Sequence, residues 1–160
     1  MEFLHRMDKQ FLVAKLNEGL VLVQGIIEVE RMLAAKSRSQ DLRSAADIAT
    51  REDETHALAL QRMIRDLGGQ VQPPPMEGRA WIEALIRAIN VERDELDRLG
   101  LYRMLKFRAV ASGEVMDVIR RSLGNPGAME SLTVLLFEDR QHAARLAQIE
   151  ASYAANQAVL

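Results

Sequence analysis

The chain has 160 residues, of which 48% are hydrophobic and 28% charged, and its formal net charge is −2. This length fits a single domain, residues 1–160, with a sizeable core. The absence of cysteine excludes disulfide scaffolds, thiol nucleophiles and cysteine-ligated zinc or iron–sulfur centres. The near-neutral charge and an aromatic content of only 4% argue against a nucleic-acid partner.

The sequence also argues against a membrane protein. Its most apolar stretch, Leu20 to Ile27, is interrupted by Gln24, whereas a membrane span needs roughly 20 apolar residues. The first residues, MEFLHRMDKQ, lack the apolar core of a secretory signal. We therefore expect a cytoplasmic protein without a membrane partner.

Four helices are predicted, because long stretches of good helix formers alternate with polar, glycine-rich or proline-rich breaks. They span residues 8–36, 41–67, 79–122 and 127–155, and the third could be broken near Ser112-Gly113. Asp41 is the expected N-cap of the second helix, and Gly68 is its expected C-terminal glycine. With two short loops and one proline-rich crossover, this order predicts an all-α antiparallel four-helix bundle with two hairpins.

The second and fourth helices carry matching core stripes. Residues at alternating spacings of four and three mark the buried face of a bundle helix. In the second helix they are Leu42, Ala46, Ala49, Asp53, His56, Leu60, Met63 and Leu67. In the fourth helix they are Ala128, Leu132, Leu135, Asp139, His142, Leu146, Ile149 and Tyr153. Both stripes are apolar except where each holds Asp and His.

An internal repeat relates the two halves by a constant offset of 86 residues. It places Glu52-Asp53 and His56 on Glu138-Asp139 and His142, and upstream it places Glu28 on Glu114. The identities fall mainly on charged and ligand-type residues, whereas a repeated packing pattern would place them on apolar positions. An Asp and a His three residues apart lie on one helix face, close enough to bind one metal ion.

Combining the stripes with the loop positions predicts a metal site inside the bundle. The loop midpoints place Glu28 near the level of Asp53, and Glu114 beside Asp139; Glu30 is the competing ligand on the first helix. Four carboxylates and two histidines would then hold two metal ions. The predicted ligands are Glu28, Asp53, His56, Glu114, Asp139 and His142. Two metals about 4 Å apart require histidines closer than about 12 Å.

The segments DETHALALQRMIRDLGGQVQPP and FEDRQHAARLAQIE resemble the corresponding helices of the ferritin-like di-iron carboxylate superfamily, in its rubrerythrin and bacterioferritin-like branch. That family has a Glu on the first and third helices and Glu-x-x-His on the second and fourth. Here both motifs carry Asp in place of Glu, at Asp53 and Asp139, and aspartate is one methylene shorter.

The resemblance implies a di-metal protein, with iron or manganese as the metals that histidine and carboxylate ligands suit. It implies iron binding with ferrous-iron oxidation or peroxide reduction, hence oxygen or peroxide as reactant and an external reductant. The alternative is a metal-free helical bundle that serves as an oligomerisation or interaction module. Because Leu20 to Ile27 is apolar nearly all round, we also expect a homodimer or larger assembly.

Overall fold

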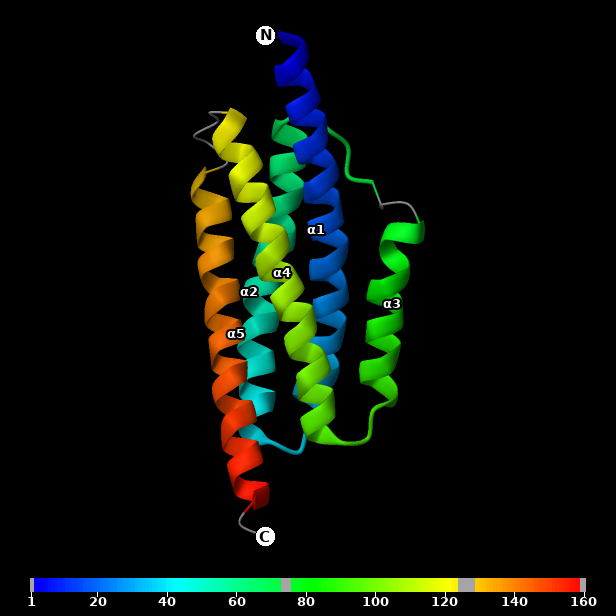
Figure 1. The fold of residues 1–160 in the computed structure, drawn as a ribbon, viewed down its shortest axis with the longest axis vertical. Helices are drawn as coiled ribbons and strands as arrows, with labels where there is room; N and C mark the ends of the chain where they lie inside the picture. Colours follow the sequence, from blue (N-terminus) through cyan, green and yellow to red (C-terminus); the bar gives the residue numbers. More distant parts are fainter. Residues whose placement is uncertain (1, 73–75, 124–128, 159–160) are drawn as a thin grey trace.

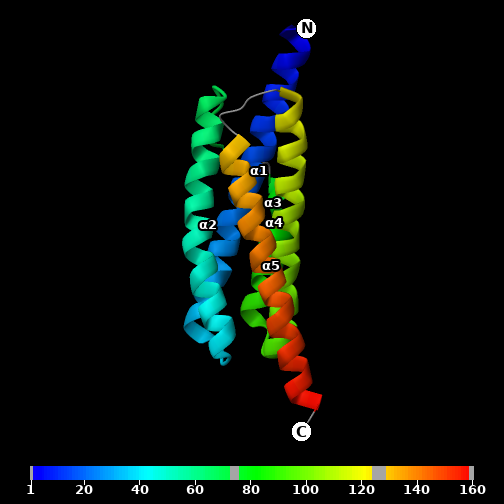
Figure 2. The same ribbon diagram turned by 90° about the vertical axis from the view of Figure 1, so that its left-hand side faces the viewer.

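The structure is a computed structural model that describes residues 2–72, 76–123 and 129–158. These residues contain five helices: α1 (Glu2–Lys36), α2 (Gln40–Asp66), α3 (Met76–Val91), α4 (Glu95–Leu123) and α5 (Met129–Ala158). Helices α1, α2, α4 and α5 form an antiparallel bundle, and the described N- and C-terminal ends lie at opposite ends of its long axis (Figures 1 and 2). The predicted bundle and its all-α class are confirmed.

The predicted third helix is two helices. The helix is interrupted at residues 92–94, while α4 continues unbroken through Ser112 and Gly113. Asp94 ends the break as an N-cap, because its side chain accepts a hydrogen bond from the backbone N–H of Asp97. The Glu92 side chain accepts from the backbone N–H groups of Arg93 and Asp94, so it holds the turn between the two helices while Asp94 caps the start of the second.

Helix α3 packs on the outside of the bundle, against α1 and α4 (Figure 1). Ile82 and Ile89 of α3 are buried where this helix faces the bundle. The side chains of Ile82 and Ile86 approach Gly25 of α1 closely. The apolar stretch of α1 is therefore covered within the chain. This removes the reason for which the sequence predicted a dimer, and self-association stays a prediction that light scattering tests.

Helix α2 begins and ends close to its predicted limits. Its N-cap is Ser39 rather than Asp41, because the Ser39 hydroxyl accepts from the Leu42 N–H at 3.2 Å. Gly68 ends the helix as predicted, with φ of 76°, a left-handed conformation that glycine adopts without strain. The predicted break at residues 124–127 and most of the proline run lie outside the described residues.

Two apolar clusters fill the bundle, one toward each end. One is built around Leu33, Leu42 and Leu105, and the other around Leu16, Leu60 and Leu135. The buried polar residues of the middle turns of the helices separate them. Among the described residues, no helix combines the length and apolarity needed to cross a membrane.

Candidate metal centre

The stripes of α2 and α5 bring their polar residues together at the middle of the bundle. Asp53, His56, Asp139 and His142 are all buried, as the heptad spacing predicts. The two imidazole rings stack with their centres 6.4 Å apart. The histidines therefore meet the distance condition for a shared site, which stays a prediction.

Each histidine is held by a glutamate from the opposite helix. His56 Nε2 lies 2.8 Å from Glu138 Oε2, and His142 Nε2 forms a short contact with Glu52 Oε2. A carboxylate that accepts from the outer nitrogen fixes the ring orientation and leaves the inner nitrogen, Nδ1, as the acceptor. The exchange is reciprocal, so the two-fold relation read from the sequence holds for these four residues.

A lysine lies at the centre of the site. Lys106 of α4 is 0% exposed, and its Nζ lies 2.9 Å from Glu30 Oε1 and 3.0 Å from His142 Nδ1. It also forms a short ion pair with Asp53 Oδ2. The hydroxyl of Tyr102 donates to Glu30 Oε1 at 2.6 Å. Helix α1 thus contributes an acid to the centre, and helix α4 contributes a lysine together with the tyrosine that donates to this acid.

Several buried polar atoms beside this ion pair have no hydrogen-bond partner. They are Glu30 Oε2, Asp53 Oδ1, His56 Nδ1 and Asp139 Oδ2, of which Asp53 Oδ1 and His56 Nδ1 lie 3.0 Å apart as an ion pair. One ligand atom each from Asp53, His56 and Asp139 lie within 4.8 Å of one another. Buried polar atoms are normally satisfied, because an unmet donor or acceptor costs about 1–3 kcal/mol. This half of the site is therefore short of a partner.

Burial and charge set the protonation of the acids. Burial is the largest influence on Glu30 and raises its pKa to about 8 despite the nearby Lys106. Burial likewise raises the pKa of Asp139 to about 6. For Asp53, burial is again the largest single influence and acts in the same direction, but the charge of Lys106 and the hydrogen bonds from His56, Lys106 and Glu30 together outweigh it, so the pKa falls below its usual value. Asp53 is thus the firmly ionised carboxylate of the centre.

Among the basic groups, the pKa values of Lys106 and His56 are raised and that of His142 is lowered. Burial lowers the pKa of Lys106, but Glu30, Asp53 and Asp139 outweigh burial and raise it, so the amine stays charged. Burial and then Lys106 lower the pKa of His142. For His56, burial is more than offset by Asp53, Asp139 and Glu138, so its pKa is raised. The centre without a metal is therefore a Lys106–Asp53 ion pair with partly titrated neighbours.

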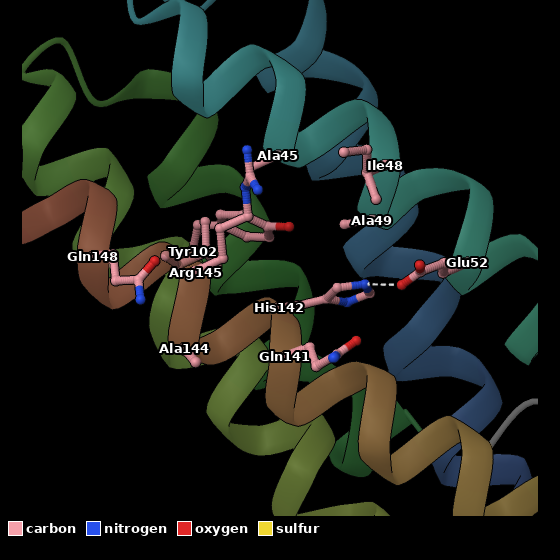
Figure 3. Close-up of a pocket in the computed structure, with 11 residues that line it drawn as sticks. Ala45, Ile48, Ala49, Glu52, Tyr102, Gln141, His142, Ala144, Arg145 and Gln148 are labelled. Carbon is pink, nitrogen blue, oxygen red and sulfur yellow. Dashed lines mark hydrogen bonds and ion pairs between the residues drawn. The ribbon is translucent and has the colours of Figure 1, made fainter.

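Two surface pockets open onto the histidine–glutamate pairs along the groove between α2 and α5. The larger, of about 390 Å³, is lined by Glu52, His142 and Tyr102, and Figure 3 shows His142 reaching across it to Glu52. The smaller, of about 250 Å³, is lined by His56 and Glu138. Seven pairs of lining residues are related by the offset: Ala45/Ser131, Ile48/Val134, Ala49/Leu135, Glu52/Glu138, Thr55/Gln141, His56/His142 and Ala59/Arg145. The repeat thus includes the approaches to the site.

The structure places two of the six predicted ligands away from the buried group. Glu28 is exposed, and Glu114, 54% exposed, forms an ion pair with Arg140 at 3.1 Å. Glu30, the competitor on α1, points inward instead. Residues two positions apart in the sequence are rotated by about 200° around a helix, so Glu28 and Glu30 lie on opposite faces. The sequence interpretation missed Lys106, which stands among exposed basic residues of α4.

Solved structures share this architecture. The crystal structure of ferritin-like, diiron-carboxylate proteins from Bacillus anthracis str. Ames has a TM-score of 0.70 over 89% of this chain and 97% of that chain, at 18% identity. A protein from Xanthomonas campestris pv. campestris has a TM-score of 0.77 over 94% of both chains, at 14% identity. The chain has the ferritin-like fold. Its sequence matches no family model and no curated protein.

The centre of this ferritin-like bundle lies where its four long helices face one another. Its two halves hold different residues. The buried Asp53–His56–Asp139 group suggests metal binding. The equivalent group on the other side, around His142, contains the Lys106 ammonium.

Proposed function

We propose that this chain is a metal-binding protein that holds a transition-metal ion, iron or manganese, between Asp53, His56 and Asp139. The observation that carries the proposal is the set of buried, unpartnered atoms on these three residues. An ion bound by these three residues would give the buried carboxylates and the imidazole a cation partner, and one ligand atom from each residue lies within 4.8 Å of the others. Two carboxylates and one imidazole are a donor set that suits iron and manganese.

The geometry is close to that of a bound ion. Ligand atoms on opposite sides of an ion with bonds of about 2.1 Å lie about 4 Å apart. The three donor atoms lie within 4.8 Å of one another, so small side-chain rotations bring them to bonding distance. Glu138 supports the arrangement, because it accepts from His56 Nε2 and leaves Nδ1 free to bind metal.

A bound iron ion would supply redox chemistry at coordination positions that the three protein ligands leave open. The proposed reactions are ferrous-iron oxidation, in which Fe(II) gives its electrons to oxygen or peroxide, and peroxide reduction, in which an external reductant supplies the electrons. The chain's own residues hold the ligands, neutralise charge and exclude water. The pocket beside His56 and Glu138 is the approach that a small reactant would use.

A metal-free interaction module is the second candidate. The observation that favours it is the Lys106–Asp53 ion pair, which compensates part of the buried negative charge without any metal. Such a bundle would keep the fold and the polar cluster as structural features only.

Metal analysis separates the two candidates. Metal-free protein is loaded anaerobically with Fe(II) or Mn(II), desalted and analysed for metal per chain, and its iron oxidation is compared with that in buffer. We expect retained metal in the wild type and its loss in His56→Ala and Asp139→Asn. Glu28→Gln and Glu114→Gln are matched controls, because both residues are exposed and should leave the metal content unchanged. Folded wild-type protein that retains no metal would overturn the proposal in favour of the module.

A further inference from the structure

We infer that the ammonium group of Lys106 occupies the second cation position of this centre, so that the chain holds one metal ion rather than two. This inference rests on the proposed function. It starts from the repeat, because α2 and α5 offer the same residues in the same positions. A symmetric centre would therefore have two equivalent cation positions, one beside each histidine.

The position beside His142 is filled. Nζ of Lys106 lies 3.0 Å from His142 Nδ1 and 2.9 Å from Glu30 Oε1, and it also contacts Asp53 Oδ2. An ammonium group has three N–H donors, and these three acceptors use all of them. They are also the atoms that a second metal ion would need as ligands.

The two histidines differ as this inference requires. The inner nitrogen of His142 accepts from Lys106, so its lone pair is engaged. The inner nitrogen of His56 has no hydrogen-bond partner, although it lies 3.0 Å from Asp53 Oδ1. Of these two residues, which the repeat relates, only His56 has an inner nitrogen that faces carboxylates, Asp53 and Asp139, rather than the Lys106 ammonium group.

The Lys106 side chain cannot leave this position by rotating into solvent. Its side chain is 0% exposed, as is that of Glu30, and Tyr102 is equally buried beside them. Moving Nζ out would require the helices to separate and would leave the Glu30 and Asp53 carboxylates without their cation. A lysine fixed in this way excludes a second ion by both space and charge.

The experiment is a stoichiometry measurement on the full chain. Metal-free wild type, Lys106→Glu, Lys106→Met and Arg103→Glu are saturated anaerobically with Mn(II), desalted and analysed for manganese per chain. We expect one ion in the wild type and two in Lys106→Glu, because glutamate replaces the cation with a ligand. Arg103→Glu makes the same charge change on α4 at a residue that pairs only with Glu150 among the described residues, and it should stay at one.

Electron paramagnetic resonance gives a second readout that does not depend on activity. An isolated Mn(II) ion gives a six-line spectrum, and we expect this from the wild type. Two ions in one site couple magnetically, and we expect that signature from Lys106→Glu. If Lys106→Glu does not fold, Lys106→Met carries the comparison, since it frees His142 Nδ1 without adding a charge and should raise the content above one.

The outcomes are distinguishable. Wild type with two ions would overturn this inference and leave the proposed function standing. Folded wild type with no ion would overturn the proposed function and this inference with it. One ion in the wild type and still one in both folded Lys106 variants would show that Lys106 is not what limits the site, and would also overturn the inference.

Discussion

Nζ of Lys106 lies 2.9 Å from Oε1 of Glu30, and the internal repeat relates neither residue to the other. The residue 86 positions before Lys106 is Leu20, and the residue 86 positions after Glu30 is Met116. All four are buried, so the repeat keeps their depth but not their chemistry. The two-fold relation therefore holds in α2 and α5 and is broken in α1 and α4, where Glu30 meets the Lys106 ammonium group.

The first prediction concerns the stability of this ion pair. In metal-free protein, Lys106→Met should lower the free energy of unfolding by about 3–5 kcal/mol, because it leaves buried carboxylates without their cation. Urea denaturation followed by circular dichroism measures it. Arg103→Met, which removes a half-exposed ion pair on the same helix, should cost less than about 1 kcal/mol. Equal midpoints for the two variants would contradict a charged role for Lys106.

The second prediction uses the repeat as its own control. Glu138→Gln should weaken metal binding by about tenfold or more, because it removes the carboxylate that orients a metal-binding histidine. Glu52→Gln should have little effect, because its partner His142 accepts from Lys106 instead of binding metal. Competition with a chromophoric chelator measures both affinities. The same loss in both variants would mean that the two histidines act alike.

The third prediction concerns Glu95, at the start of α4. Its carboxylate accepts from Ser37, from the backbone N–H groups of Arg38 and Ser39, and from Tyr153. It thereby joins the α1–α2 loop to α4 and α5. Glu95→Gln should lower the free energy of unfolding by about 1 kcal/mol at neutral pH, since hydrogen bonds to a charged acceptor are the stronger ones and this site is partly wet.

The pH dependence of this effect has a definite sign. Partial burial raises the pKa of Glu95, but the hydrogen bonds from Ser37, Ser39 and Arg38 outweigh it, so the pKa lies below its ordinary value of 4.5. A carboxyl with a lowered folded-state pKa contributes stability above its unfolded-state pKa and loses it as pH falls through the folded value. The difference between wild type and Glu95→Gln should therefore be constant above about pH 5.5 and shrink below pH 4.5. A difference that grows on acidification would contradict this role.

The fourth prediction tests whether α3 is part of the core. Ile89→Ala should cost about 2–4 kcal/mol, because the side chain is 0% exposed against α1 and α4. Val91→Ala, two residues further on and 76% exposed, is the control and should change little. Denaturant unfolding measures both. If Ile89→Ala is as mild as its control, α3 does not contribute to the folded unit.

The sequence alone determined the helical class, the two hairpins and the residues of α2 and α5 that face inward. In both helices the core stripe with its spacing of four and three fixes the rotation and places Asp53, His56, Asp139 and His142 inside. The glycine at the end of α2 was also readable, because its position requires a left-handed backbone.

Part of what was missed was also readable. The buried stripe of α4 runs through Leu99, Tyr102, Lys106, Ala109, Gly113, Met116 and Arg120, with the spacing of four and three used for α2 and α5. Applied to α4, that test would have placed Lys106 inside. Lys106 stands between Arg103 and Arg108, and a run of basic residues is typical of a solvated face, so this charge pattern did not indicate that Lys106 is buried.

Only the tertiary structure decided between Glu28 and Glu30. Residues 20–27 of α1 are apolar nearly all round, so the hydrophobic pattern does not fix the rotation of this helix. That pattern exists because α1 packs against the bundle on one side and against α3 on the other, and the break that creates α3 was not predicted. With α3 packed against one side of α1, Glu30 faces the centre and contacts Lys106. In place of the predicted pair of metal positions, the structure has one donor group beside one buried ammonium group.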